Sequence, residues 1–401
     1  MSKNKSPGYD GIPNEFYQYF WEDVKEMIIN SFNEAFEKGE LSETHKQIVL
    51  SLIFKKGDRD SYKNYRPISL SNVDYKILAF VLSKRLQKVI AKIISPEQVA
   101  YIEKRYIGQN IRTLLDIIEY AKKHNKPGIL LFLDFEKAFD SINWKFIDKC
   151  LIKFGFKEDF CKWIKIIYKD PKAFLKVNGF ISESILIGRG IRQGCPLSSL
   201  LFIICTEFMA LNLKQDNSFD GFPFSTNTDT YEIKITQYAD DTCIFLKNQY
   251  DIDKALNNIN AFSRVSGLTL NISKTEGLCI GQYVDMKPEY KTIKWPEHPI
   301  RYLGIYIGND KEVCEKLNWT NKIDDMQKLI DSWRTRKLTL QGKILIIKSL
   351  VIPKITYSAS MLSVPNHIIK DINKLMFNFI WGKSEKIQRK ILTSSYENGG
   401  L

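Results

Sequence analysis

Three aspartates in two stretches of the chain are the residues best suited to chemistry. Asp240 and Asp241 are adjacent, and they lie between the alternating polar and apolar residues 232–237 and the apolar run 242–246. This pattern predicts two strands joined by a tight turn, with both carboxylates at its tip. An Asp-Asp turn can simply be solvated, but two adjacent carboxylates beside apolar residues favour a bound cation.

Asp134 follows the wholly apolar run 129–133, which predicts a strand buried on both faces. A carboxylate at the end of a buried strand is costly unless a metal ion or another cation compensates its charge. We therefore expect Asp134 to converge with Asp240 and Asp241 on bound metal. Magnesium prefers oxygen ligands and often shares them with substrate phosphates, so these residues favour phosphate chemistry over zinc-dependent hydrolysis.

The two stretches resemble the paired catalytic motifs of reverse transcriptases, specifically those of non-LTR (LINE-type) retrotransposons. Residues 133–140 read LDFEKAFD and residues 238–241 read YADD. Five further stretches that resemble the family follow in the family's order: 6–13, 65–70, 190–198, 268–276 and 302–304. No single motif supports the assignment alone, whereas seven in this order are very specific. One departure is Ser199, where the family usually has proline.

The resemblance implies an α+β, right-hand polymerase fold, with an antiparallel-sheet palm and packed helices, fingers and a helical thumb. We expect residues 1–308 to form the fingers and palm, with the fingers mainly within 1–125. Residues 309–383 are expected to form the thumb, and residues 384–401 a flexible tail.

The same resemblance implies an RNA-directed DNA polymerase that extends a DNA primer with dNTPs on an RNA template. Asp134, Asp240 and Asp241 would hold two Mg²⁺ ions, for which Mn²⁺ could substitute, and the Phe135 carbonyl could join them. The alternatives are a group II intron type of reverse transcriptase (maturase) and a decayed element that binds nucleic acid without copying it. The family's endonuclease and Cys/His knuckle are not recognisable here, which implies endonuclease and nucleic-acid-binding domains missing from this chain.

Two basic residues near the predicted strand 48–54 are assigned to the incoming nucleotide. Arg66 has a guanidinium suited to bidentate phosphate contacts, and Pro67 holds it extended. The resemblance places Arg66 in the fingers. Lys55 directly follows the strand and can reach a triphosphate, although a solvated turn is the simpler explanation of its position.

A glycine-rich, basic loop over residues 188–194 follows a hairpin predicted at Asn178-Gly179. Such a loop lets the backbone approach a nucleotide closely, but by itself it is weak evidence for phosphate binding. The resemblance implies that Gln193 and Gly194 contact the incoming nucleotide and that Arg192 lies close by.

Phe139 and Lys274 each have two interpretations. By the resemblance, Phe139 is a steric gate whose ring excludes a ribose 2′-hydroxyl, and otherwise it is a core aromatic at the start of the next helix. By the resemblance, Lys274 protonates the leaving pyrophosphate, a role that contributes about 10²–10⁴-fold in rate, and otherwise it is a surface lysine.

Primer and template contacts are assigned to the C-terminal part of the chain. Residues 302–308 resemble a primer-grip strand, and a basic helical thumb would hold the backbone of a nucleic-acid duplex. The residues assigned to primer or template are Tyr302, Leu303, Gly304, Lys322, Arg334 and Arg336.

Amphipathic patterns predict the scaffold helices. They cover residues 14–38, 71–94, 196–213, 253–262, 344–352 and 368–381. We expect Gly39, Gly267 and Gly382 to end three of them and Pro353 to interrupt the fifth. Basic side chains on the 71–94 helix form either a solvated face or a template track; they are Lys76, Lys84, Arg85, Lys88 and Lys92.

Composition bounds the partners and the compartment. The 401 residues, 44% of them hydrophobic, are enough for two domains, and the net charge of +13 favours a polyanionic partner. Nucleic acid is favoured over a membrane because the most apolar segment, 196–213, is too short in its charge-free part to span a bilayer. The seven cysteines form no CxxC pair and no leader opens the chain, so we expect an intracellular location, nuclear for an active element.

Overall fold

The computed structural model describes residues 3–225, 229–286, 288–382 and 387–398, and these fall into two units. The first unit comprises residues 1–107, 127–277 and 287–294. The second comprises residues 108–126, 278–286 and 295–401. Each unit therefore combines segments that are distant in the sequence, and the division into fingers, palm and thumb at residues 308 and 383 stays a prediction.

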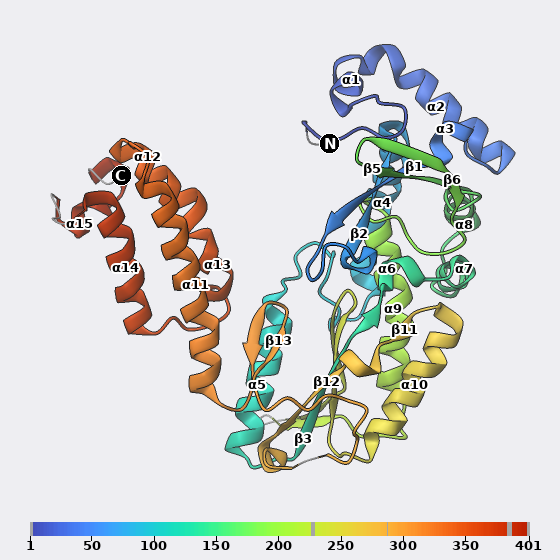
Figure 1. Ribbon diagram of the computed structural model, residues 1–401. Coiled ribbons are helices and arrows are strands. Elements are labelled where there is room, and N and C mark those ends of the chain that lie inside the picture. The colour runs from blue at the N-terminus through green and yellow to red at the C-terminus, as the bar shows by residue number, and fades with distance from the viewer. Residues whose placement is uncertain (1–2, 226–228, 287, 383–386, 399–401) are drawn as a thin grey trace. The chain divides into compact units, whose positions relative to one another are not determined.

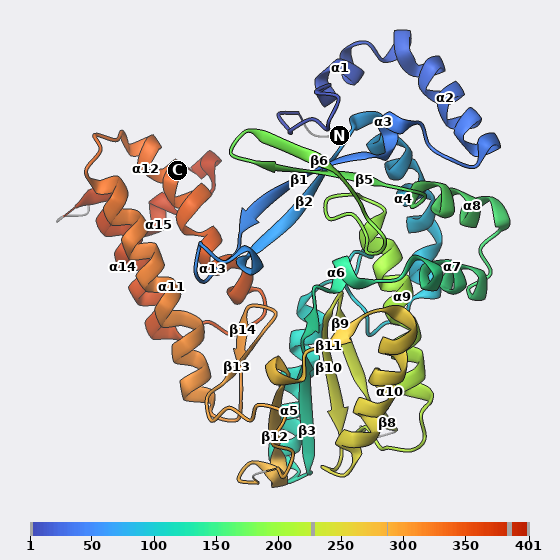
Figure 2. The ribbon, with the colours of Figure 1, turned by 45° about the vertical axis from the view of Figure 1, so that its right-hand side comes forward.

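Four strands of the first unit form a sheet in the order β2-β1-β5-β6 (Figure 2). They are β1 (Gln47–Phe54), β2 (Tyr65–Ser71), β5 (Lys172–Val177) and β6 (Phe180–Leu186). Strand β1 pairs antiparallel with β2 and parallel with β5, and β5 and β6 form a hairpin. At its turn Asn178 and Gly179 have φ values of 50° and 87°, as a type I′ turn requires, so the predicted hairpin is confirmed.

A second set of strands in this unit carries the aspartates. Strands β3 (Gly128–Leu133), β10 (Asp241–Leu246) and β9 (Ile235–Tyr238) lie side by side and antiparallel, with β10 in the middle (Figure 2). Every residue of β3 is buried, which confirms the strand predicted before Asp134.

The strand expected over 232–237 is wrong in extent, because the chain changes partner at Lys234. Strand β8 (Thr230–Ile233) pairs with β7 (Phe222–Ser225), whereas β9 pairs with β10. Between them the Lys234 carbonyl accepts a hydrogen bond from the Phe245 amide (2.9 Å), and its ammonium donates to the Asp216 carbonyl (2.7 Å). The alternating pattern therefore spans the ends of two strands.

Helix α9 (Ser198–Gln215) is buried over most of its length in the first unit. It packs against α4 (Val73–Ile93), α7 (Trp144–Lys153) and α10 (Asp251–Ser266), which lie around it in Figure 1. It begins two residues after Pro196, where the sequence predicts its start. Although α9 is strongly apolar, no helix among the described residues has the length and hydropathy needed to cross a membrane.

Two other predicted helices differ in detail from the structure. The segment 14–38 forms α1 (Asn14–Tyr19) and α2 (Trp21–Lys38), divided at Phe20, and Met27 in its apolar pattern is exposed. The helix predicted over 71–94 is α4, which begins at Val73, and the side-chain amide of the preceding Asn72 donates to the Thr44 carbonyl (2.9 Å). Gly39 and Gly267 end α2 and α10 in the left-handed conformation, as predicted.

The remaining elements of the first unit are short. They are α3 (Glu43–Lys46), β4 (Phe135–Glu136), α6 (Ala138–Ser141), α8 (Glu158–Ile167), β11 (Thr269–Leu270) and 3₁₀ turns at Tyr62–Asn64 and Ile272–Lys274. Strand β4 pairs with β11, and beyond this pair the Asn271 amide donates to the Asp134 carbonyl (2.7 Å). This bond holds the segment before Lys274 beside Asp134.

The second unit is mainly helical. Its elements are α5 (Gly108–Lys123), β12 (Glu276–Ile280, of which 278–280 belong here), a 3₁₀ turn at Gly281–Tyr283, β13 (Ile300–Tyr302), β14 (Ile305–Ile307), α11 (Lys311–Arg334), α12 (Leu340–Ile346), α13 (Pro353–Ala359), α14 (Asn366–Trp381), α15 (Arg389–Leu392) and a 3₁₀ turn at Tyr396–Asn398. Helices α11 to α14 lie side by side (Figure 1). They enclose an apolar core that includes the buried side chains of Trp319, Met326 and Ile330.

Pro353 does not interrupt its helix as the sequence predicts. A π-helical turn, Ile347–Val351, connects α12 to α13, and the Ile352 amide donates to the Ile347 carbonyl five residues back (2.9 Å). The wider turn accommodates a proline that lacks an N–H and would clash with an α-helical carbonyl. Gly382 ends α14 as predicted, while residues 384–386 and 399–401 of the expected tail lie outside the described residues.

The segment expected as one primer-grip strand is a hairpin. Strands β13 and β14 pair antiparallel, and Leu303 and Gly304 make the turn with φ values of 46° and 81°. The hydroxyl of Tyr357, on α13, donates to the Leu303 carbonyl. The helical core of the second unit therefore holds the turn of this hairpin.

Asn318 on α11 joins this hairpin to the helices. Its Oδ1 accepts from the Tyr306 amide and its Nδ2 donates to the Tyr306 carbonyl, both at 2.9 Å, and the side chain is buried. We expect Asn318→Leu to lower the free energy of unfolding by about 1–3 kcal/mol, because both backbone groups of Tyr306 lose their partner in a buried place. Urea denaturation measures this.

The matched control for Asn318→Leu is Gln327→Leu, which removes an amide on the same helix whose partner, Asp331, lies one turn away near the surface. Its effect should stay within about 0.5 kcal/mol. Equal stability of the Asn318 variant and the wild type would show that the two hydrogen bonds between Asn318 and Tyr306 contribute nothing to the free energy of unfolding.

Candidate active site

The register of the β3-β10-β9 strands brings the three aspartates together. Leu133 of β3 pairs with Thr242 of β10 in antiparallel register. Asp134 follows Leu133 and Asp241 precedes Thr242, so the two aspartates lie at the same end of the paired strands. Asp240 precedes Asp241 in the turn to β9. Asp134 therefore lies beside the Asp240-Asp241 tip, and the role of the three carboxylates as metal ligands stays a prediction.

Electrostatics reflect this crowding of carboxylates. Burial is the main cause that raises the pKa of Asp240 above its ordinary value, and the negative charge of Asp134 adds to it. The surrounding protein likewise desolvates the Asp241 carboxylate, and with Asp240 and Asp134 nearby its pKa rises to about 6, although the residue as a whole keeps contact with solvent. Three anions in one partly desolvated place require compensation by positive charge.

Part of this compensation comes from the β1-β2 sheet. Arg66 on β2 pairs across the strands with Ile53, and the amide of Lys55, just after β1, donates to the Asn64 carbonyl (2.9 Å). The charges of Arg66 and Lys55 both act on Asp240 and lower its pKa. The structure thus places both predicted triphosphate ligands near the carboxylates.

The pKa of Lys55 itself shows that cations gather here. It is lowered chiefly by burial, then by the neighbouring charges of Arg66 and Lys56, while Asp134 opposes the shift. Lys274 also acts on Lys55, so the structure brings this exposed lysine to the site as well. Its role as a proton donor stays a prediction.

The donor set fits a divalent cation only if the substrate completes it. Among the described residues no three His, Cys, Asp or Glu side chains are close enough to enclose an ion by themselves. Magnesium usually takes one or two carboxylates and fills its remaining positions with water and phosphate oxygens. Asp134 and the Asp240-Asp241 pair therefore fit a metal that is shared with a phosphate substrate.

The loop 188–194 is fixed from both sides. The Gly190 amide donates to the Ile142 carbonyl (2.8 Å), and the Gln193 carbonyl accepts from the Ser69 amide of β2 (2.9 Å). Gly190 has a φ of 86°, and a Cβ there would lie 2.6 Å from the Asp140 carbonyl oxygen, so this position requires glycine. The loop is thereby held between α6 and β2.

Gln193 is oriented by a residue that the sequence reasoning missed. Its Nε2 donates to Oδ1 of Asp140 (2.9 Å), whose pKa burial raises while this bond lowers it. A carboxylate can only accept from the amide, so the Gln193 Oε1 faces the other way. Gly194, with a φ of 102°, continues the loop beside the Ser69 carbonyl.

Arg192 is held inside the protein. It is buried, its guanidinium lies 4.2 Å from the ring centre of Tyr75, and its Nη2 donates to the Ile167 carbonyl (3.1 Å). An arginine in a glycine-rich loop is expected to be exposed. Here the face of the Tyr75 ring and the Ile167 carbonyl hold its guanidinium in the interior. These contacts of Arg192 anchor the loop to the interior of the first unit.

Phe135 and Phe139 both belong to the motif of residues 133–140. Phe139, in α6, is half-buried and stacks on Phe202 of α9 with ring centres 4.5 Å apart and planes 12° apart. Phe135 is buried in β4 opposite Leu270. The core packing of Phe139 is thus present, while its role as a gate and the Phe135 carbonyl as a ligand stay predictions.

The residues assigned to primer and template all belong to the second unit. Tyr302 is buried in β13, and burial lowers the pKa of Lys322, to which the charge of Arg301 adds. Arg334 pairs with Asp331 (3.2 Å), and Arg336 stacks over Trp333 at 4.3 Å. These contacts order the basic side chains.

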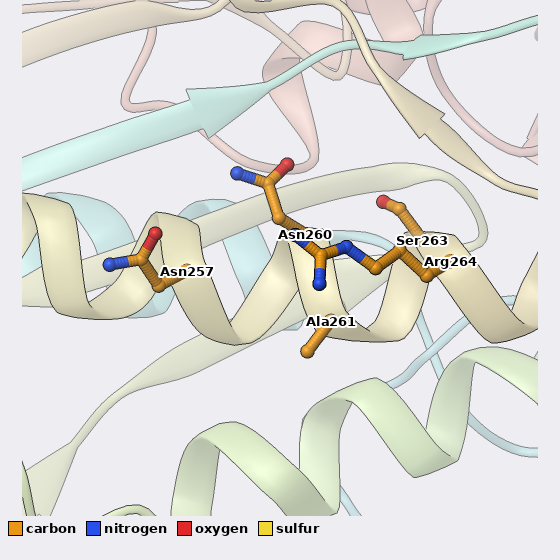
Figure 3. Close-up of a pocket in the computed structure, with 5 residues that line it drawn as sticks. All are labelled: Asn257, Asn260, Ala261, Ser263 and Arg264. Carbon is orange, nitrogen blue, oxygen red and sulfur yellow. The ribbon is translucent and has the colours of Figure 1, made fainter.

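A separate pocket of about 510 Å³ lies along α10 (Figure 3). It is lined by Asn257, Asn260, Ala261, Ser263 and Arg264. None of these is a predicted site residue, and the lining has no carboxylate for a metal. The pocket is therefore distinct from the aspartate site.

Divalent metal should stabilise the first unit through the aspartates. A ligand that binds only the folded state at 100 times its Kd stabilises by about 2.7 kcal/mol, so Mg²⁺ or Mn²⁺ should raise the melting temperature of the wild type. Asp134→Asn should melt at a temperature that metal leaves nearly unchanged. Calorimetry with and without metal measures both, and an equal response of the two proteins would place the metal elsewhere.

Comparison with known proteins gives the family. Residues 53–307 match the family described as reverse transcriptase (RNA-dependent DNA polymerase). The chain is 30% identical over its full length to the transposon TX1 uncharacterized 149 kDa protein of Xenopus laevis, of which it covers 30%. It is 25% identical over 81% of its length to the Pol polyprotein of the type-1 retrotransposable element R2 of Popillia japonica, of which it covers 46%.

A solved structure of telomerase from Candida albicans, in complex with a fragment of telomeric RNA, is similar at a TM-score of 0.49 and 10% identity, over 92% of this chain and 67% of that one. The chain spans less than half the length of the two relatives named above. The expected resemblance to non-LTR retrotransposon enzymes and the expected α+β, right-hand polymerase fold are confirmed. The chain belongs to the reverse transcriptase (RNA-dependent DNA polymerase) family.

Proposed function

We propose that this chain is an RNA-directed DNA polymerase that extends a primer 3′-hydroxyl with dNTPs, as in non-LTR retrotransposition. The observation that carries the proposal is that Asp134, Asp240 and Asp241 lie together at one end of the β3-β10-β9 strands. The positive charges of Arg66 and Lys55 are close enough to lower the pKa of Asp240, and that of Lys55 also lowers the pKa of Asp241. Carboxylates that need metal, next to cations that suit phosphate, form the arrangement that nucleotidyl transfer requires.

Asp134 and Asp240 would hold two Mg²⁺ ions, or Mn²⁺ in their place, with Asp241 assisting. When bound, such ions activate the attacking hydroxyl and neutralise charge on the leaving pyrophosphate. Arg66 and Lys55 bind the triphosphate from the β1-β2 side, and Lys274 holds a proton for the leaving group.

RNA template and DNA primer are the partners of this reaction. The relatives are much longer than this chain, which supports further endonuclease and nucleic-acid-binding domains in the complete protein. The net charge of +13 supports backbone-directed, salt-sensitive binding of duplex. We assign its site of action to the nucleus, where an element meets its genomic target.

Primer extension on an RNA template with dNTPs and Mg²⁺ tests the proposal. The chain should lengthen the primer one nucleotide at a time, and a dideoxynucleotide should stop synthesis at the complementary template position. Duplex binding without any extension, in Mg²⁺ and in Mn²⁺, would instead identify an element that binds nucleic acid and does not copy it.

A further inference from the structure

The turn that carries the aspartates contains a residue in an unfavourable conformation. Ala239, between Tyr238 and Asp240, has a φ of 57°, in the left-handed region that residues with a Cβ rarely adopt. It is buried, so water cannot support its backbone groups. The negative charges of Asp240 and Asp241, which follow it, are also repelled by that of Asp134. Something else in the protein must hold this backbone.

Gln98 binds both backbone groups of Ala239. Its Oε1 accepts from the Ala239 amide (2.9 Å) and its Nε2 donates to the Ala239 carbonyl (3.3 Å), across 141 residues of sequence. The same Oε1 accepts from the Ala100 amide (3.1 Å). Two N–H groups converge on this atom, so it must be the oxygen and the orientation of the amide is determined. Gln98 is only 1% exposed, which leaves Ala239 no competing solvent partner there.

The segment around Gln98 is itself held in place. Gln98 forms an isolated parallel bridge with Gln237 of β9, where the Val99 amide donates to the Gln237 carbonyl (3.1 Å). Arg105 Nη1 donates to the carbonyls of Gln98 and Ser95, both at 2.6 Å. Its Nη2 donates to the carbonyl of Ile94 (2.7 Å), at the end of α4. These hydrogen bonds fix the backbone from which the Gln98 side chain extends.

We propose that Gln98 is a positioning residue that holds the Ala239 turn so that Asp240 and Asp241 face Asp134 before any metal binds. This inference rests on the proposed metal-dependent synthesis but concerns a residue that touches neither metal nor substrate. Partners that orient metal ligands from behind typically change metal affinity or activity about 10- to 100-fold when they are removed. Loss of the hydrogen bonds between Gln98 and Ala239 should weaken metal binding and lower kcat, and it should leave primer-template binding unchanged.

The test compares Gln98→Leu with the wild type by Mn²⁺ titration followed by electron paramagnetic resonance, and by steady-state primer extension. We expect Mn²⁺ affinity and kcat to fall about 10- to 100-fold, with an unchanged KM for primer-template. Gln87→Leu is the matched control, because Gln87 donates to the Tyr101 carbonyl (2.7 Å) in the same segment without contacting Ala239. It should behave as the wild type does.

A second substitution separates positioning from general damage. Glycine adopts positive φ without strain, so Ala239→Gly in the Gln98→Leu background should restore part of the Mn²⁺ affinity. A variant that is merely destabilised would not be rescued in this way. If Gln98→Leu does not fold, Gln98→Asn keeps the amide but is one methylene too short to reach Ala239, and it should show the same loss.

The outcomes are distinct from those of the proposed function. Weaker Mn²⁺ binding by the Gln98 variants supports the inference even if the wild type extends no primer. Wild-type Mn²⁺ affinity in a folded Gln98→Leu protein overturns it, whether or not the wild type is a polymerase.

Discussion

Asp240→Asn is expected to reduce primer extension on the order of 10³-fold or more. The change keeps the shape of the side chain but removes the charge with which Asp240, beside Asp134, would bind metal. Metal ions supply several kcal/mol of transition-state stabilisation, and each 1.36 kcal/mol corresponds to a factor of ten in rate. The measurement is single-turnover extension of a labelled primer on RNA with dNTPs and Mg²⁺.

Two further variants make the test of Asp240 specific. Asp220→Asn is the same substitution at an exposed position, where Asp220 pairs with Lys247 (3.2 Å), and it should leave the rate unchanged. Asp241→Asn should lose less activity than Asp240→Asn, because we assign Asp241 an assisting role. Full synthesis by Asp240→Asn, at the rate of the Asp220 control, would remove this aspartate from the mechanism.

Phe139→Val is expected to increase ribonucleotide incorporation on the order of 10²-fold relative to dNTP incorporation, the scale on which pocket shape discriminates small groups. Phe139 stacks on Phe202, which is fully buried in α9, so the core holds one face of the ring. This contact restrains the ring from moving aside for a 2′-hydroxyl. The core interpretation and the gate interpretation of Phe139 are therefore compatible.

Competition between a dNTP and the matching rNTP on one RNA template measures this selectivity. Phe139→Tyr serves as the control, because it keeps the ring and its stacking and should keep the preference for dNTPs. A Phe139→Val enzyme that copies at the normal rate with unchanged selectivity would leave Phe139 as a core aromatic alone.

Much of the site follows from local patterns in the sequence. The apolar run before Asp134, the strand after Asp241 and the Asn178-Gly179 turn all form as predicted. Buried strands, two-residue hairpins and glycine helix ends depend on neighbouring residues and on φ values that few residue types adopt. Such features can therefore be read without knowledge of distant contacts.

Other features depend on partners that are remote in the chain. Arg192 turns inward because Tyr75 offers its ring, and the π turn before Pro353 keeps its helix continuous. The strand predicted over 232–237 breaks because its two halves pair with different strands. Burial and pairing of this kind are set by the whole fold, which local periodicity does not describe.

The type of chemistry can be read from local motifs: Asp134, Asp240 and Asp241, in ordered motifs, indicate metal-dependent phosphate chemistry of the reverse transcriptase type. The contacts that hold these residues in place come from distant parts of the chain. Gln98 clasps Ala239 across 141 residues, and Asp140 orients Gln193 across 53. Hydrogen bonds at such separations form only after the strands and helices have packed. The groups that they join are far apart in the sequence, so local patterns cannot predict that they will meet.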